Sequence, residues 1–259
     1  MPSRESLSEK LGNNVNERLI NLVIGLLGGV LILAGILFCD FWGSKWETVI
    51  ISVGASLVAS AVVSYLSSIY IYKRKREKEI TETWGLYSID ESRAQMNYFI
   101  GQNLENVTDH LDIIAYGLKS FRESKRKLIN EKVKHGLEIR IITVNPNYEY
   151  LSQKDVDEKK LKDSTKESIK QLCRWIVELQ KIKGSKVKIK FCKTLPTEVY
   201  FRVDDYIYTG PYQCGRESQR TITMEYRRPG KGFDYYKDYF DTLWNDVEFC
   251  NEDTTLLNL

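Results

Sequence analysis

Arginine and tyrosine side chains alternate through residues 200–228. Arginine can bind a phosphate with two hydrogen bonds, and tyrosine can stack on a base. This mixture is typical of sites for nucleotides or single-stranded nucleic acid. A solvated, two-sided β-ribbon would carry the same pattern, so both interpretations stay open. The residues are Arg202, Arg216, Arg220, Arg227 and Arg228, interleaved with Tyr200, Tyr206, Tyr208, Tyr212 and Tyr226.

A second pattern suited to phosphate lies at residues 116–120, between a predicted strand and a predicted helix. The free N–H groups of a helix N-terminus, with Lys119 beside them, favour an anion, although an ordinary strand-to-helix turn looks alike. We predict that Arg93, Lys119 and Arg202 bind a phosphate. The complete set of candidate ligand-binding residues is Arg93, Tyr116, Lys119, Ser120, Asn145, Arg202, Tyr212 and Arg216.

The elements that must position these residues alternate along the chain. Residues 111–116, 137–144 and 187–191 read as strands, and helices are expected near 90–108, 120–135 and from Ser164. Ser164 and Glu167 have the spacing of a capping box. Strand–helix–strand repeats predict a mainly parallel sheet with ligands at the carboxyl ends of its strands. Residues 197–209 and 221–227, joined by the loop 210–215, predict an antiparallel extension, and an aromatic helix at 233–249 closes the domain.

Two uncharged hydrophobic stretches, 19–39 and 48–72, are each long enough to cross a bilayer. Only Lys45 is basic in the short loop between them. Basic residues flank the outer ends, which predicts that both termini lie in the cytoplasm of a two-span inner-membrane protein and contact lipid headgroups. These residues are Arg4, Lys10, Arg18, Lys73, Arg74, Lys75 and Arg76. The predicted parts are a loose tail (1–18), a membrane hairpin (19–72), a charged stalk (73–83), an α/β domain (84–250) and a disordered tail (251–259).

A ladder of serines occupies every fourth position of the second stretch. On a helix it would extend over roughly 24 Å of membrane depth. Such a stripe either packs against another helix or faces water in a pore, and a pore would need an oligomer, on the order of four copies. The sequence leaves both roles open. The serines are Ser52, Ser56, Ser60, Ser64 and Ser68.

The composition bears on nucleic-acid binding, on metal sites and on disulfides. The 259 residues carry a formal net charge of +3, too mild by itself to indicate nucleic-acid binding. Only His110 and His135 are present, and neither is spaced with a cysteine as metal ligands are, so we expect no metal and no cofactor. In a reducing cytoplasm the five cysteines are expected to be free thiols: Cys39, Cys173, Cys192, Cys214 and Cys250.

The segment 199–213 resembles the final strand pair of degenerate phospholipase-D-like domains, and residues 137–146 and 236–244 fit the same pattern. Active members of that superfamily use a His-x-Lys motif, whose histidine attacks phosphorus. Here the corresponding residues are Tyr200-Phe201-Arg202. Without that nucleophile the covalent route is closed, so this resemblance predicts a phosphodiester-binding domain that has no catalytic residues and is not an enzyme.

The complete layout resembles two-span membrane effectors of prokaryotic anti-phage systems that use nucleotide signals, of the Hailong type or the cyclic-oligonucleotide (CBASS-like) type. In the Hailong family a companion nucleotidyltransferase makes a DNA oligomer that holds the channel shut. The resemblance implies a homo-oligomeric channel gated by a nucleotide or a single-stranded oligonucleotide. The alternatives are a membrane-anchored phosphodiesterase or nuclease, and a non-conducting membrane scaffold.

Overall fold

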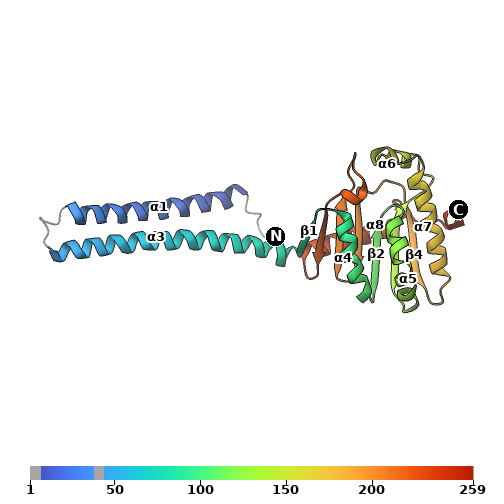
Figure 1. Cartoon of the computed structure of the whole chain (residues 1–259), viewed down its shortest axis with the longest axis horizontal. Coiled ribbons are helices and arrows are strands. Elements are labelled where there is room, and N and C mark those ends of the chain that lie inside the picture. Colours follow the sequence, from blue (N-terminus) through green and yellow to red (C-terminus); the bar gives the residue numbers. More distant parts are fainter. Residues whose placement is uncertain (1–6, 38–43, 259) are drawn as a thin grey trace. The chain divides into compact units, whose positions relative to one another are not determined.

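The computed structural model describes residues 7–37 and 44–258 of the chain. By internal contacts the chain divides into two compact units, Met1–Lys78 and Glu79–Leu259. The first unit is a pair of helices, and the second is a mixed-sheet α/β domain (Figure 1). We describe each unit by itself.

The helical unit is an antiparallel hairpin of α1 (Leu7–Leu37) and α3 (Ser44–Lys78). By length and composition alone, the helical segments Leu19–Leu37 and Trp46–Thr83 could each cross a membrane. The two backbones approach closely at a pair of glycines: a Cβ atom added to Gly54 would lie 2.7 Å from the carbonyl oxygen of Gly28. Small residues are what allow helices to approach this closely, so glycine is required at this contact.

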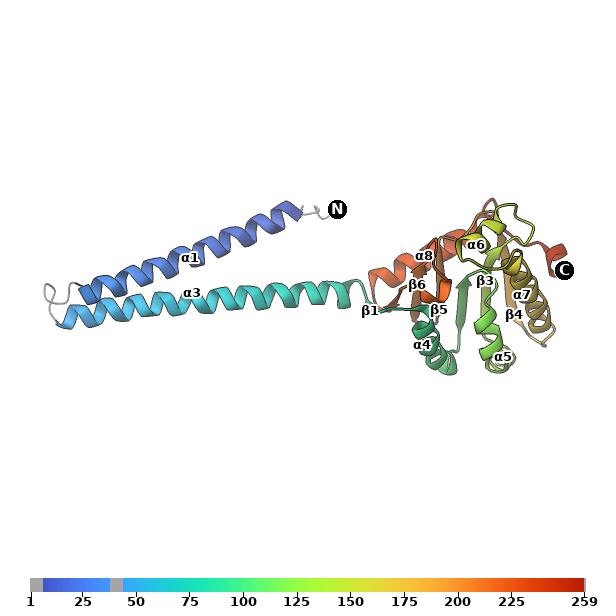
Figure 2. The same cartoon turned by 45° about the horizontal axis from the view of Figure 1, so that its top comes forward.

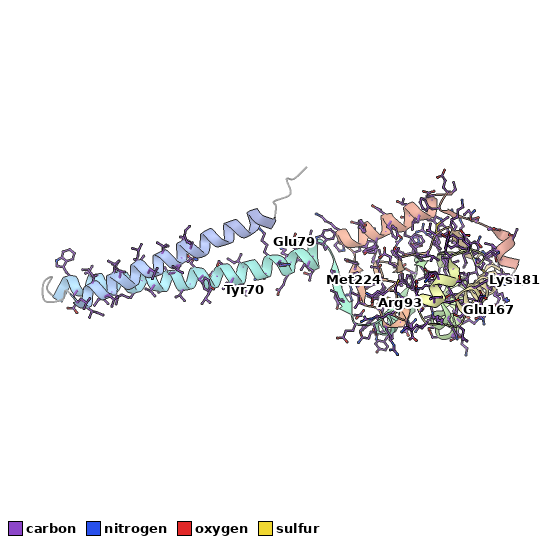
Figure 3. All side chains as sticks on the ribbon, turned by 90° about the horizontal axis from the view of Figure 1, so that it is seen from above. Tyr70, Glu79, Arg93, Glu167, Lys181 and Met224 are labelled. Carbon is purple, nitrogen blue, oxygen red and sulfur yellow. A yellow bond between two sulfur atoms is a disulfide. The ribbon has the colours of Figure 1, made fainter. Side chains whose placement is uncertain are left out.

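The serine ladder lies outside this helix–helix contact. Ser52, Ser56, Ser60 and Ser64 are exposed in the single chain, and Ser68 is half-buried. The Ser56 hydroxyl donates to the carbonyl oxygen of Ser52 at 2.8 Å, as serines in helices often do. Tyr70, labelled in Figure 3, is exposed on the same helix. Packing between α1 and α3 therefore does not account for the ladder.

In the second unit the described residues form one eight-stranded sheet with the order β1-β7-β6-β5-β2-β3-β4-β8. Strands β2, β3 and β4 run parallel, and the other neighbours are antiparallel. The strands are β1 (Leu86–Asp90), β2 (His110–Ile114), β3 (Glu138–Val144), β4 (Lys186–Cys192), β5 (Glu198–Val203), β6 (Tyr206–Pro211), β7 (Thr223–Arg227) and β8 (Cys250–Asn251). A π-helical turn, η1 (Glu79–Thr83), precedes β1.

Helices cover both faces of this sheet (Figure 2). Helices α4 (Arg93–Asn106), α5 (Lys119–Lys134) and α7 (Ser164–Gln180) lie on one face, and α8 (Lys231–Asn245) lies on the other. Side chains alternate between the faces along each strand. On β5, for example, Val199 and Phe201 belong to the core under α5 and α7, whereas Tyr200 packs in the core under α8.

The prediction of one strand over residues 197–209 is wrong, because these residues form the two strands of the hairpin β5–β6. The chain reverses at Asp204, whose φ of 48° lies in the left-handed region that aspartate tolerates better than most residues. The Asp204 carboxylate accepts three backbone N–H bonds from the segment before β2, those of Thr108 (2.9 Å), Asp109 (3.1 Å) and His110 (2.8 Å). The turn is therefore stabilised from outside the hairpin, which no local pattern shows.

Two further predictions are corrected near the C-terminus. Cys192 and Cys250 form a disulfide between β4 and β8, so they are not free thiols, while Cys173 and Cys214 are free and Cys39 lies outside the described residues. The segment predicted to be a disordered tail contributes β8 and the 3-10 helix η3 (Thr254–Asn258). Leu256 in η3 is buried in the core that includes the apolar residues of α7, and this burial of apolar surface orders the segment.

We predict that Asp204→Asn lowers the free energy of unfolding of the full chain by about 1 kcal/mol near neutral pH, since one acceptor oxygen is replaced by a donor. Burial raises the pKa of Asp204, but its backbone N–H bonds outweigh that and hold the pKa below its usual 3.8. The stabilisation is therefore present above this pH and lost as pH falls further. Thermal unfolding against pH measures it.

The matched control is Asp205→Asn in the same turn. The Asp205 side chain is 60% exposed and pairs with Arg228 at 3.4 Å, so its loss should cost less than about 0.5 kcal/mol. Equal effects of the two substitutions would contradict the role assigned to Asp204.

Candidate phosphate-binding site

A cavity of about 530 Å³ opens beyond the carboxyl end of β2. Its wall is formed by the start of α4, the turn between β2 and α5, residues 154–161, the start of α7, strand β5 and the loop after β6. Parallel sheets generally bind ligands at this edge. The cavity lies on the sheet face covered by α4, α5 and α7, because Val199 and Phe201 of β5 line it.

Five of the eight predicted ligand-binding residues line this cavity: Arg93, Tyr116, Lys119, Ser120 and Tyr212. They come from four separate elements, so the fold brings together residues that are distant in sequence. The other three, Asn145, Arg202 and Arg216, are not among its lining residues. That these residues bind a phosphate stays a prediction.

The turn between β2 and α5 is shaped by tight packing. A Cβ atom added to Gly117 would lie 2.0 Å from the Ser168 hydroxyl of α7, so only glycine fits there. Leu118 then adopts a left-handed conformation (φ 50°), and α5 begins at Lys119. No side chain caps this helix start. The first N–H groups of α5 therefore have no side-chain cap, and the exposed residues at this helix start, Lys119 and Ser120, line the cavity.

Two cations contact the ring of Tyr212. The Lys154 ammonium lies 4.1 Å from the ring centroid, and the guanidinium carbon of Arg93 lies 4.7 Å from it. Tyr116 meets Tyr212 edge to face, with centroids 4.9 Å apart. Burial raises the pKa of both phenols, so they are neutral near pH 7. Cation–π contacts thus hold positive charge against an aromatic wall of the cavity.

Arg93 is nearly buried, with 6% of its surface exposed. Figure 3 labels it within the α/β domain. Its Nη2 donates to the hydroxyl of Thr221 at 3.3 Å, whereas its buried Nε has no hydrogen-bond partner among the described residues. A buried donor without an acceptor is costly, and a bound anion would supply one.

A carboxylate with three donors lies at the same cavity wall. Glu158 forms ion pairs with Lys154 at 2.6 Å and with Lys160 at 2.5 Å, and it accepts a hydrogen bond from the hydroxyl of Ser218. Burial would raise the pKa of Glu158, but these donors outweigh it and lower that pKa to about 2. Burial also lowers the pKa of Lys154, an effect that Glu158 partly offsets. The group is ionised at neutral pH and holds two lysines in the cavity.

The sequence pattern did not reveal Lys154, Glu158 and Lys160. Lys154 lies in the short helix α6 (Leu151–Asp157), and Glu158 and Lys160 follow it. This helix was not predicted because its polar residues resemble a loop. The one available signal was the spacing of four between Lys154 and Glu158, which places both on one helical face.

The capping box predicted for α7 is also wrong. The carboxylate of Asp155, itself buried, accepts from the Thr165 N–H at 3.0 Å and from the Ser164 hydroxyl at 2.9 Å. Asp155 therefore replaces Ser164 as the capping group. Because Ser164 and Thr165 line the cavity, the same bonds connect α6 to the cavity wall.

Arg202 belongs to a different polar cluster, which argues against its predicted role in phosphate binding. It follows Phe201 on β5, so its side chain lies on the α8 face of the sheet. There Arg202 donates to the buried Asp112 at 3.1 Å, and Arg140 donates to the same carboxylate at 2.7 and 2.8 Å. Arg140 also pairs with Asp241 of α8 at 3.0 Å. This cluster attaches α8 to the sheet.

Asn145 and Arg216 also have other positions. The Asn145 side chain accepts from the N–H of Asn147 at 2.8 Å, which forms the turn that ends β3. Arg216 is exposed in the loop after β6. Other arginines of the predicted arginine–tyrosine pattern already have partners within the domain. Arg227 pairs with Glu225 and lies over the ring of Tyr87, and Arg228 pairs with Asp205.

The cavity has an excess of positive charge. Four cationic residues line it, against two acidic ones. The cations are Arg93, Lys119, Lys154 and Lys160, and the acids are Glu158 and Glu217. No histidine is among the lining residues. Within residues 7–37 and 44–258, no group of three histidine, cysteine, aspartate or glutamate side chains is placed to hold a metal ion.

Comparisons with known proteins are limited to fold. No family model and no curated protein matches the sequence. Similar solved structures include TrmBL2, an archaeal chromatin protein with a novel mode of DNA binding (TM-score 0.41, 10% identity, 73% of this chain and 68% of that one). NucT from Helicobacter pylori has a TM-score of 0.41 at 12% identity, over 64% of this chain and 98% of that one. Phosphatidylserine synthase from Haemophilus influenzae has 0.43 at 10% identity, over 70% of this chain and 44% of that one.

NucT and the synthase are phospholipase-D-like, and the synthase is by name an enzyme. This finding contradicts the prediction that the chain is not an enzyme, which rested on the missing His-x-Lys motif, and we withdraw that prediction. At these scores and identities, the activities of the similar proteins do not determine the activity of this one.

We predict that Glu158→Gln lowers the free energy of unfolding by about 3 kcal/mol near neutral pH, because Lys154 is left buried without its counter-charge. Since the folded pKa of Glu158 is depressed to about 2 from 4.5, the stabilisation is present above pH 4.5 and is lost as pH falls toward 2. Chemical denaturation of wild type and variant across this range measures it. A difference independent of pH would show that the charge of Glu158 is not involved.

Proposed function

We propose that this protein is a membrane-anchored receptor whose α/β domain binds a nucleotide or a short single-stranded oligonucleotide through a phosphate. The observation that carries this proposal is Arg93, a buried guanidinium at the cavity wall whose Nε has no acceptor. Burying a cation is expensive unless an anion compensates for it. A phosphate in the cavity would compensate and would accept two hydrogen bonds from one guanidinium.

The composition of the cavity supports the same class of ligand. Lys119 and the start of α5 add a second group of donors across from Arg93. The volume of about 530 Å³ lies within the range of small-molecule sites. Because most arginines after Tyr212 are already paired with acidic side chains, the proposal is limited to a ligand that fits this cavity.

We predict that Arg93→Met weakens the binding of AMP and of a short 5′-phosphorylated single-stranded DNA by about tenfold or more, since the charge-assisted hydrogen bonds of the guanidinium are removed. Isothermal titration calorimetry on the full chain in a phosphate-free detergent measures this. Arg216→Met, in the exposed loop outside the cavity, is the matched control and should bind as wild type does. Equal affinities of all three proteins, or no binding by wild type, would refute the proposal.

The same samples test the alternative function, a membrane-anchored phosphodiesterase or nuclease. The released products are separated by chromatography after incubation of the DNA with each protein. Turnover by wild type that Arg93→Met abolishes would make the cavity an active site, while binding without turnover would favour a receptor.

For the helical hairpin, we propose that several copies assemble into a channel that the ligand gates, with a companion nucleotidyltransferase as the source of the ligand in an anti-phage system. What supports the channel is the exposed serine ladder, because Gly28 and Gly54 already form the contact within one chain. A helix surface rich in hydroxyl groups is unfavourable in lipid and would be satisfied by water or by another helix.

We predict that Ser60→Leu and Ser64→Leu reduce single-channel conductance in planar bilayers without reducing assembly, because leucine would narrow and dry a water-filled path. Val63→Leu, an exposed apolar position on the same helix, is the matched control and should conduct as wild type does. Loss of the oligomer in cross-linking, with no conductance in any protein, would instead favour a scaffold whose serines pack between helices.

A further inference from the structure

The carboxylate of Glu158 has the surroundings of a bound ligand. Its side chain is fully buried at the wall of the cavity, where it pairs with two ammonium groups at 2.6 and 2.5 Å and accepts a hydrogen bond from one hydroxyl. Lys154, at 7% exposure, reaches the carboxylate from the same helical face, whereas Lys160 is 45% exposed and reaches it on a long, flexible side chain. These donors are polar and cationic, as in a site for an anion.

A carboxylate and a phosphodiester are hydrogen-bond acceptors with similar chemistry. Each offers two equivalent oxygens that share one negative charge, and a phosphomonoester offers three oxygens with a larger charge. The donors on Glu158 could therefore bind any of these groups, and the surplus of cations in the cavity favours the more highly charged ones. Arg93, with its unpartnered Nε, belongs to the same cavity.

We infer that the carboxylate of Glu158 occupies, in the free protein, the position that a phosphate of the ligand occupies in the complex. The ligand binds by replacing Glu158 as the partner of Lys154 and Lys160. This inference rests on the proposed function, because it concerns the same cavity. Glu158 is then an internal competitor that sets the affinity of the site and favours ligands with enough charge to displace it.

The displacement has a consequence for the neighbouring segment 215–221, between β6 and β7. Ser218 is attached to Glu158, and the Gly215 N–H donates to the carbonyl oxygen of Asp157 at 2.8 Å. At its other end the segment is attached to α4, where Asn97 donates to Gln219 at 3.2 Å. When a phosphate takes the position of the Glu158 carboxylate, Glu158 moves away from Ser218 as well as from its lysines, and this segment becomes more mobile.

The test compares full-length wild type, Glu158→Gln and the control Glu167→Gln in a phosphate-free detergent. Glu167 is a half-exposed acid on α7 that does not line the cavity (Figure 3). The probes are methyl phosphate and dimethyl phosphate, which separate the monoester from the diester. We expect Glu158→Gln to bind the preferred probe about tenfold tighter than wild type, or roughly 1.4 kcal/mol, and Glu167→Gln to bind it as wild type does.

The outcomes separate the two proposals. If wild type binds a probe but a folded Glu158→Gln binds it equally or more weakly, the displacement is refuted and the receptor function stands. If neither protein binds either probe, both proposals fail.

A second measurement on wild type alone covers the case in which Glu158→Gln does not fold. Amide hydrogen exchange in residues 215–221, followed by mass spectrometry, should become faster when the preferred probe is added, because Ser218 loses its partner. Unchanged or slower exchange at saturating probe would overturn the displacement.

Discussion

The alternation of side chains along β2 and β5 places two groups of polar residues on opposite faces of the sheet: the charged cluster around Asp112, and the cavity that Arg93 lines. Successive residues of a strand point to opposite faces. Phe201 therefore lies on the face with the cavity, whereas Asp112 and Arg202 lie on the face under α8. On the α8 face, opposite charges neutralise one another within hydrogen-bond distance. On the cavity face, positive charge is in excess, and this difference is what makes one cluster structural and the other a candidate site.

Much of this arrangement could be predicted from hydrophobic periodicity. The apolar stripe of α7, including Ile169, Leu172 and Ile176, is fully buried. The parallel strands β2, β3 and β4 coincide with the apolar runs that the sequence shows before turn residues. Phe233, Phe240 and Trp244 of α8 pack in one core. Val247 does not, because α8 ends at Asn245 and leaves it 70% exposed. The rule that ligands bind at the carboxyl ends of parallel strands then located the cavity.

The parts that could not be predicted depend on contacts between distant residues. Asp155 caps α7 from another helix, and Asp204 satisfies the N–H groups of His110 and its neighbours from a hairpin far along the chain. Neither bond leaves a periodic pattern. Arg202 shows the opposite problem. An arginine on a strand near the expected site looks like a phosphate ligand, and only the register of β5 against β2 shows that Asp112 already binds it.

The pairing of β1 with β7 has a consequence for biosynthesis. Leu86 pairs with Tyr226, so the first strand of the domain has its neighbour near the end of the chain. As the ribosome delivers the chain, the helical hairpin and β1 emerge well before β7 exists. Contacts this distant in sequence form late because a long loop must close first. Until then the exposed Tyr87 and Ile89 lie on a strand without a partner, a state in which strand edges are prone to pair with other chains. Slow completion of the domain would therefore favour chaperones that act while synthesis continues.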